Sequence, residues 1–282
     1  GKSTLIRHIN RLIEPTSGEV LVGGEDVLAM SDEELKNFRR SKASMVFQKF
    51  ALLPHRTVIE NVGYGLQIQK ISETEINKRS QHWIDRVGLT GFEDHYPAQL
   101  SGGMQQRVGL ARALATDAEI LLMDEAFSAL DPLIRTDMQG ILLGLQEELH
   151  KTIVFITHDL DEALRIGDEI SILRDGEVVQ QGTSQEIVMT PSDDYIADFI
   201  KDVNRARVLE VRSIMEPSKT DKGPRLDLTT PLEDAMGKLS EAGETSGCVV
   251  DDKGHVIGKI ELSAAISAIK RPEKTSTELR YR

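Results

Sequence analysis

Two short apolar runs, residues 119–124 and 152–157, limit what this chain can fold into. Each has the length of one strand, and neither alternates strictly between polar and apolar residues, which is typical of parallel strands buried on both faces. A helical pattern at 133–149 lies between them, with Pro132 suited to its first turn. Helix and strand patterns alternate from the first residues to about residue 200. The sequence therefore predicts an α/β domain built on a parallel sheet.

The first run ends in two acids, Asp124 and Glu125. In open α/β sheets, ligands bind where the strands end. Asp124 is suited to hold Mg²⁺, and Glu125 to orient or deprotonate an attacking water. His158 follows the second run and is expected to hydrogen-bond a γ-phosphate oxygen. The alternative, two solvated acids and a structural histidine, is disfavoured by phosphate-binding patterns elsewhere in the chain.

The first of these patterns is Ser101-Gly102-Gly103, which opens a helical stretch at 104–115. A glycine turn at a helix start offers free N–H groups and a positive dipole end, both of which favour phosphate. The second pattern opens the chain and is the tail of a phosphate-binding loop, G-x-x-x-x-G-K-[ST]. It consists of Gly1, Lys2, Ser3 and Thr4.

In such a loop Lys2 meets the β- and γ-phosphates, Ser3 coordinates Mg²⁺ through its hydroxyl, and Thr4 reaches the α-phosphate. The loop's first glycine and the strand that feeds it would precede residue 1, so the chain is expected to be truncated at its N-terminus. Gln48 follows a predicted strand at 45–47, where its amide can ligate the metal and sense the γ-phosphate.

Composition narrows the function further. The 282 residues carry a net charge of −12, which argues against a general nucleic-acid binder. The single cysteine, Cys248, has no partner for an internal disulfide and indicates a reducing compartment. No apolar run reaches the roughly 18 residues that span a membrane.

Three segments are expected along the chain. Residues 1–202 form the first domain, with a helical subdomain at about 50–115. A small domain at 203–270 contains a helix after Pro231, a hairpin of 247–250 with 256–260, and a helix at 262–269. Residues 271–282 form a basic tail.

The order of these motifs resembles that of an ATP-binding cassette (ABC) ATPase, a P-loop NTPase with a helical subdomain. The resemblance covers residues 1 to about 200 and adds a D-loop, Ser128-Ala129-Leu130-Asp131, after Glu125. It implies ATP and Mg²⁺ as ligands. The implied catalytic residues are Glu125 and His158, and the implied metal ligands are Ser3, Gln48 and Asp124. The implied nucleotide-binding residues are Gly1, Lys2, Ser3, Thr4, Gln48, Ser101, Gly102, Gly103 and Asp131.

The family architecture also implies partners. Each nucleotide would lie between the Lys2 loop of one chain and the Ser101 turn of another in a head-to-tail homodimer. Residues 49–66 would touch integral membrane permease subunits, and an extracytoplasmic substrate-binding protein would act indirectly. The expected location is peripheral, on the cytoplasmic face of the cell membrane, without nucleic acid.

Finer likenesses suggest the transported solute. Ala126 stands where most relatives have proline, and with Leu133-Ile134-Arg135 it resembles the ATPase subunits of glycine betaine/proline betaine (quaternary amine) importers. Ser213–Pro217, 249–254 and Gly258 resemble a CBS module, the small α+β domain that follows many such cassettes. Only one repeat fits, so a pair would form across the dimer or the module would be vestigial.

Other functions stay open at this point. The same machine can serve another solute, such as an amino acid or a sulfonate. A non-transport ABC ATPase of DNA repair or translation usually carries two cassettes or a long coiled coil, neither of which is visible. A regulator without turnover would not need both Glu125 and His158. The basic tail would either contact an anionic membrane surface or be merely solvated.

Overall fold

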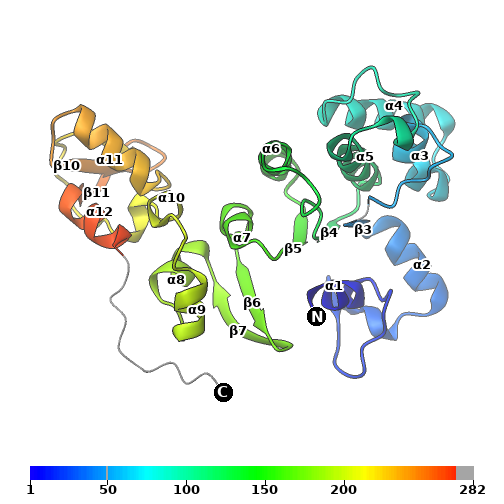
Figure 1. Cartoon of the computed structure of the whole chain (residues 1–282), viewed down its shortest axis with the longest axis horizontal. Helices are drawn as coiled ribbons and strands as arrows, with labels where there is room; N and C mark the ends of the chain where they lie inside the picture. Colours follow the sequence, from blue (N-terminus) through cyan, green and yellow to red (C-terminus); the bar gives the residue numbers. More distant parts are fainter. Residues whose placement is uncertain (49, 271–282) are drawn as a thin grey trace. The chain divides into compact units, whose positions relative to one another are not determined.

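The computed structural model describes residues 1–48 and 50–270, which divide after Asp159 into two compact units. The first unit, Gly1–Asp159, is built on the parallel sheet that the apolar runs predict (Figure 1). Its strand order is β3 (Ala43–Val46), β4 (Ile120–Asp124), β5 (Thr152–Ile156). Both neighbouring pairs are parallel, and Asp124 lies opposite Ile156. The ends of β4 and β5 therefore meet at one edge of the sheet.

Burial follows the position of each strand in this order. The central strand β4 is buried from Leu121 to Asp124. In the edge strand β5, Thr152 is exposed, the next three residues are half-buried and only Ile156 is buried, so the expectation of a second fully buried strand was wrong. An edge strand has a neighbour on one side only, which leaves more of its surface uncovered.

Helix α1 (Lys2–Ile9) packs against β4 and β5. Its Ile6 is fully buried in a cluster with Leu122 and Ile156. The sequence after it forms a short hairpin, β1 (Leu21–Val22) with β2 (Glu25–Asp26). A 3₁₀ turn, η1 (Val27–Ala29), leads to α2 (Asp32–Ser41), which begins with a capping box of Ser31 and Glu34.

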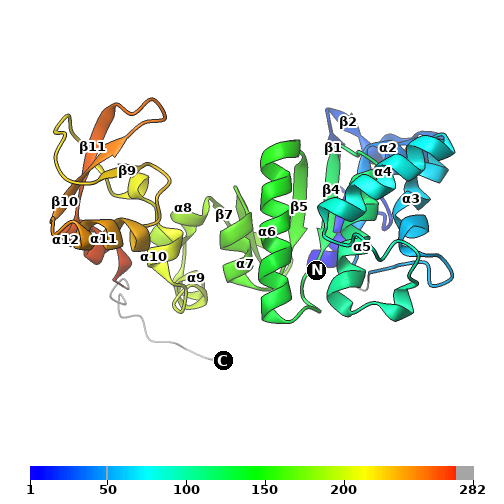
Figure 2. The same ribbon diagram turned by 90° about the horizontal axis from the view of Figure 1, so that it is seen from above.

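Three helices form the expected helical part of this unit and lie together in both views (Figures 1 and 2). They are α3 (Val58–Ile68), α4 (Glu73–Arg86) and α5 (Gly102–Ala115), with the 3₁₀ turn η2 (Pro97–Gln99) just before α5. Helix α6 (Pro132–Leu149) connects β4 to β5. The crossover from strand to helix to parallel strand is the connection that an α/β sheet requires.

The second unit begins with α7 (Leu160–Ile166) and an antiparallel hairpin of β6 (Ile170–Arg174) and β7 (Glu177–Gly182). Asp175 and Gly176, which connect the two strands, both have positive φ, as a two-residue hairpin turn demands. Short helices follow: α8 (Ser184–Met189), α9 (Asp194–Phe199), α10 (Arg205–Val208) and the 3₁₀ turn η3 (Val211–Ser213).

The rest of this unit is a four-stranded sheet with two helices. The strand order is β8 (Glu216–Pro217), β11 (Val256–Glu261), β10 (Ser246–Val250), β9 (Arg225–Asp227). The helices are α11 (Leu232–Glu241) and α12 (Leu262–Ile269). The hairpin and both helices occur where the sequence predicts them, whereas β8 and β9 were not predicted because each is only two or three residues long.

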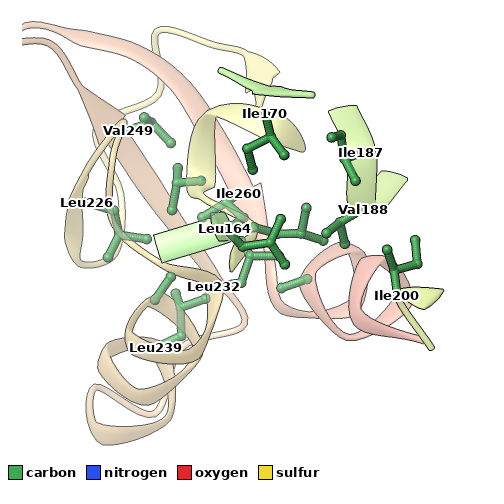
Figure 3. Close-up of a cluster of buried hydrophobic side chains, with 14 of the residues drawn as sticks. Leu164, Ile170, Ile187, Val188, Ile200, Leu226, Leu232, Leu239, Val249 and Ile260 are labelled. Atoms are coloured by element: carbon green, nitrogen blue, oxygen red, sulfur yellow. The ribbon is translucent and has the colours of Figure 1, made fainter. Parts of the chain in front are cut away.

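One apolar core joins segments on both sides of residue 202 (Figure 3). Leu164, Ile170 and Ile187 come from before that residue, and Leu232 and Ile260 come from after it. Segments 160–202 and 203–270 share this core. The division into domains 1–202 and 203–270 stays a prediction based on composition. The predicted tail, 271–282, lies outside the described residues.

Candidate functional site

The site forms where β3, β4 and β5 end. Asp124 is the last residue of β4 and is 2% exposed. Its Oδ2 accepts a hydrogen bond from Arg7 Nη2 at 3.0 Å, whereas Oδ1 is buried and has no hydrogen-bond partner among the described residues. A buried carboxylate oxygen without a donor is costly unless a ligand completes it. This oxygen therefore fits a divalent cation or a water bound to one.

Glu125 leaves the strand direction at once. Its φ is 46°, a left-handed conformation that costs a non-glycine residue roughly 1–3 kcal/mol. Its N–H still donates to Ile156 O at 2.9 Å, so a hydrogen bond to the end of β5 holds the backbone here. Such strain, kept in place by its surroundings, is common at sites that orient a reactive group.

Two predicted site residues converge on the Glu125 carboxylate. Gln48 Nε2 donates to Glu125 Oε2 at 3.1 Å and to Ser128 Oγ at 3.3 Å. His158 Nδ1 lies 3.4 Å from the same Oε2. Ser128 Oγ donates in turn to Glu125 O at 2.9 Å. Gln48 is 77 positions from Glu125 and 80 positions from Ser128 in the sequence, yet all three belong to one polar cluster around the Glu125 carboxylate.

The phosphate-loop residues lie on a helix whose N-terminus has no side-chain cap. Lys2, Ser3 and Thr4 form the first turn of α1, whose N-cap, Gly1, supplies no side-chain acceptor. The N–H groups of Lys2 and Ser3 have no recorded acceptor among the described residues and can receive phosphate, whereas the Thr4 N–H donates to Gly1 O at 3.1 Å. Helix α1 packs on β4 and β5, and its Arg7 reaches Asp124 at the end of β4.

The Ser101 turn has the predicted form. Ser101 is the N-cap of α5, and its Oγ accepts from Met104 N at 3.3 Å. Gly103 is required by close packing, because a Cβ there would lie 2.6 Å from Ile134 Cγ2. No hydrogen bond or ion pair within 1–48 and 50–270 joins Ser101, Gly102 or Gly103 to Lys2 or Glu125. Their predicted role at a nucleotide stays a prediction.

Asp131, predicted to contact the nucleotide, has a visible structural task. It is the N-cap of α6, and its Oδ1 accepts from Leu133 N and Ile134 N, each at 3.1 Å. Next to it, Arg135 Nη1 pairs with Asp159 Oδ2 at 3.1 Å. These contacts fix the turn between β4 and α6, and a contact of Asp131 with nucleotide stays a prediction.

Sequence reasoning missed Arg7. It pairs with Asp124 across 117 positions, and its Nε is also buried without a partner. A signal was available: Arg7 follows Ser3 by four residues, so helical periodicity places both on one face of α1. The arginine pairs with one oxygen of Asp124 and leaves the other without a hydrogen-bond partner among the described residues.

The described residues contain no ready-made cage of three or more His, Cys, Asp or Glu for a metal ion. The unpartnered Oδ1 of Asp124 suits Mg²⁺, which is commonly held by one or two protein groups together with substrate phosphates. Among the described helices, none combines the length and the apolar character needed to cross a bilayer.

Comparisons with known proteins identify the family of the chain. The sequence profile of the ABC transporter family matches residues 1–128. The chain is 52% identical over 271 residues to the glycine betaine transport ATP-binding protein OpuAA of Bacillus subtilis, covering 95% of this chain and 63% of that protein. It is 50% identical over 282 residues to the glycine betaine/carnitine transport ATP-binding protein GbuA of Listeria monocytogenes, covering 99% and 69%.

A solved structure of an ATP-binding cassette has a similar fold. It is a dimeric ATP-binding cassette in a post-hydrolysis state, bound to ADP and Pi. The TM-score is 0.60 at 39% sequence identity, over 65% of this chain and 81% of that one. The two relatives OpuAA and GbuA are longer than this chain, which spans about two thirds of the length of each.

Proposed function

This chain belongs to the family of ABC transporter ATP-binding subunits that serves glycine betaine and proline betaine systems, and from that premise we propose that it hydrolyses ATP to energise import of such osmoprotectants. The observation that carries the proposal is the convergence of Gln48 and His158 on Glu125, beside the buried Asp124. A carboxylate held between an amide and an imidazole is positioned to orient and accept a proton from water.

The residues divide the work of binding and chemistry. In this proposal the phosphates are bound by Gly1, Lys2, Ser3 and Thr4. Mg²⁺ would be held by Ser3, Gln48 and Asp124. Glu125 accepts the proton of the attacking water, and His158 contacts the terminal phosphate. Bound Mg²⁺ supplies positive charge that offsets the charge developing on the phosphates. The unpartnered Oδ1 of Asp124 supports its place as a ligand. Arg7 keeps the Asp124 side chain in one orientation through Oδ2.

We infer a homodimer in which the Ser101 turn of each chain closes the nucleotide site of the other. The cassette of similar fold bound to ADP and Pi is dimeric, which supports this arrangement. Gly102 and Gly103 place unencumbered N–H groups at the start of α5, where a γ-phosphate would be favoured. Asp131, at the start of α6, would lie at the same interface.

Membrane permease subunits are the proposed partners, with an extracytoplasmic substrate-binding protein acting through them. The chain would then lie peripherally on the cytoplasmic face of the membrane. The docking segment would be 49–66, within which the part from residue 50 onward is described. Its helix α3 starts with a capping box, in which Glu60 accepts from Thr57 N–H at 2.8 Å. That hydrogen bond lowers the pKa of the Glu60 carboxyl.

A regulatory CBS-like role for 203–270 is part of the same proposal. The order β9, α11, β10, β11, α12 is an alternation of strands and helices that supports such a module. Strand β9 pairs in parallel with β10, and β10 pairs antiparallel with β11.

Replacing the base tests the proposed function. In the assembled transporter, Glu125→Gln should lower ATP turnover by about 10²–10⁴-fold, the usual contribution of a general base. The variant should also trap an ATP-bound dimer, detectable by size-exclusion chromatography. Glu147→Gln, at an exposed position on α6, is the matched control. Unchanged turnover in Glu125→Gln, or no betaine uptake by wild-type transporter in vesicles, would refute the proposal.

A further inference from the structure

The backbone directly after Gln48 is strained. Phe50 and Ala51 are consecutive non-glycine residues with φ of 54° and 47°. A turn in which Phe50 N–H donates to Phe47 O at 3.2 Å connects them to the end of β3. Left-handed conformations at two adjacent side-chain-bearing residues persist only when neighbouring groups hold them. The structure must therefore contain a clamp for this loop.

Arg112, on α5, provides that clamp. Its Nη1 donates to Ala51 O at 2.7 Å, and its Nη2 donates to Phe50 O at 3.0 Å. Burial lowers the pKa of this guanidinium, but an arginine stays charged at neutral pH. The planar fork reaches two consecutive carbonyls at once, which the point charge of a lysine does not reproduce.

Helix α5 also holds the chain on the other side of Gln48. Ser44 Oγ, on β3, donates to Ala113 O at 2.8 Å. One turn earlier on the helix, a Cβ on Gly109 would be 3.7 Å from Phe50 O, an ordinary contact that shows how closely the loop lies against α5. Gln48 thus stands between two backbone segments that are both tied to one helix.

We propose that Arg112 is a positioning residue, which fixes the strained Phe50–Ala51 backbone so that the Gln48 amide meets Glu125. This inference rests on the proposed function, because it takes Glu125 to be the base. It goes beyond that function in assigning a task to a side chain remote from the polar cluster. The loop would otherwise relax toward right-handed or extended φ values, and the direction of Gln48 would change with it.

The test uses Arg112→Lys, Ala51→Gly and the double variant in the assembled transporter. Arg112→Lys should lower kcat about tenfold, the factor expected for one lost charge-assisted hydrogen bond, and change the KM for ATP less than about twofold. Glycine adopts positive φ without strain. Ala51→Gly should therefore recover much of the lost kcat in the Arg112→Lys background. Arg79→Lys, which alters an ion pair on the surface of α4, is the matched control.

A second readout does not depend on turnover. Amide hydrogen exchange of a peptide covering 50–57 should accelerate in Arg112→Lys and not in Arg79→Lys. If exchange accelerates while wild-type protein shows no ATPase activity, the proposed function fails and the positioning inference stands. Unchanged exchange, or a kcat loss that Ala51→Gly does not relieve, overturns the inference.

A further variant covers the case in which Arg112→Lys does not fold. Ala51→Val leaves the clamp intact but makes the left-handed conformation harder to adopt, because a β-branched side chain tolerates positive φ poorly. It should also lower kcat with little change in KM. Wild-type kcat in Ala51→Val would contradict the claim that this backbone geometry sets Gln48.

Discussion

Asn61 organises the loop before α3, and its replacement by alanine should destabilise the first unit. The side chain is fully buried. Its Nδ2 donates to three carbonyl oxygens, those of Leu53, Arg56 and Thr57, at 3.1, 3.0 and 2.9 Å. Its Oδ1 accepts from Leu53 N at 2.8 Å. The Asn61 amide thus links both ends of the segment 53–57 by hydrogen bonds.

The contacts that remain after the substitution set the size of the effect. Leu53 O keeps the Arg56 N–H, and Thr57 O keeps the backbone N–H of residue 61. Among the described residues, Leu53 N and Arg56 O lose their recorded partners. Two unsatisfied groups at about 1–3 kcal/mol each would cost about 2–6 kcal/mol if fully buried. Because Leu53 and Arg56 are only half-buried, water recovers part of this, and we expect about 2–3 kcal/mol.

The only tryptophan, Trp83, is suited to the measurement because it lies on α4, which packs against α3. Its emission during urea unfolding would report the free energy of unfolding of this unit. Asn77→Ala, at an exposed position of α4, is the control and should change stability by less than about 0.5 kcal/mol. A loss below about 1 kcal/mol for Asn61→Ala would show that the loop does not depend on this amide.

Two further predictions concern packing and pH. Gly103→Ala should lower the free energy of unfolding by about 1–3 kcal/mol, because the new methyl group clashes with Ile134, and Ile134→Leu should relieve that loss. Gly140→Ala, with open space around it, should leave stability unchanged or raise it. Equal urea midpoints for all variants would contradict the packing argument. The Asp251 carboxyl accepts from the backbone N–H of His255 at 2.8 Å, which lowers its pKa. A lowered folded-state pKa gives stability that is present above the unfolded pKa of about 3.9 and is lost as pH falls through the folded-state pKa. The urea midpoint of wild type should therefore drop as pH falls below about 3.9, and that of Asp251→Asn should drop less.

The order of motifs could be predicted because each depends on local pattern. Apolar runs 119–124 and 152–157 became neighbouring parallel strands, and Glu125, after the first run, lies next to His158, after the second. The physical reason is general: parallel strands end at the same edge of a sheet, so residues that follow them lie close together. Capping residues such as Ser101 and turn residues such as Asp175 act within a few positions, and the sequence alone shows them.

Long-range contacts were decided only by the tertiary structure. The pairing of Arg7 with Asp124 spans 117 positions, and the clamp of Arg112 on Phe50 spans 62. The apolar core that joins 160–202 to 203–270 likewise has no local signature, because any amphipathic face can pack against several partners. Periodicity determines which side of a helix or strand is apolar, whereas the partner of that side depends on how the whole chain packs.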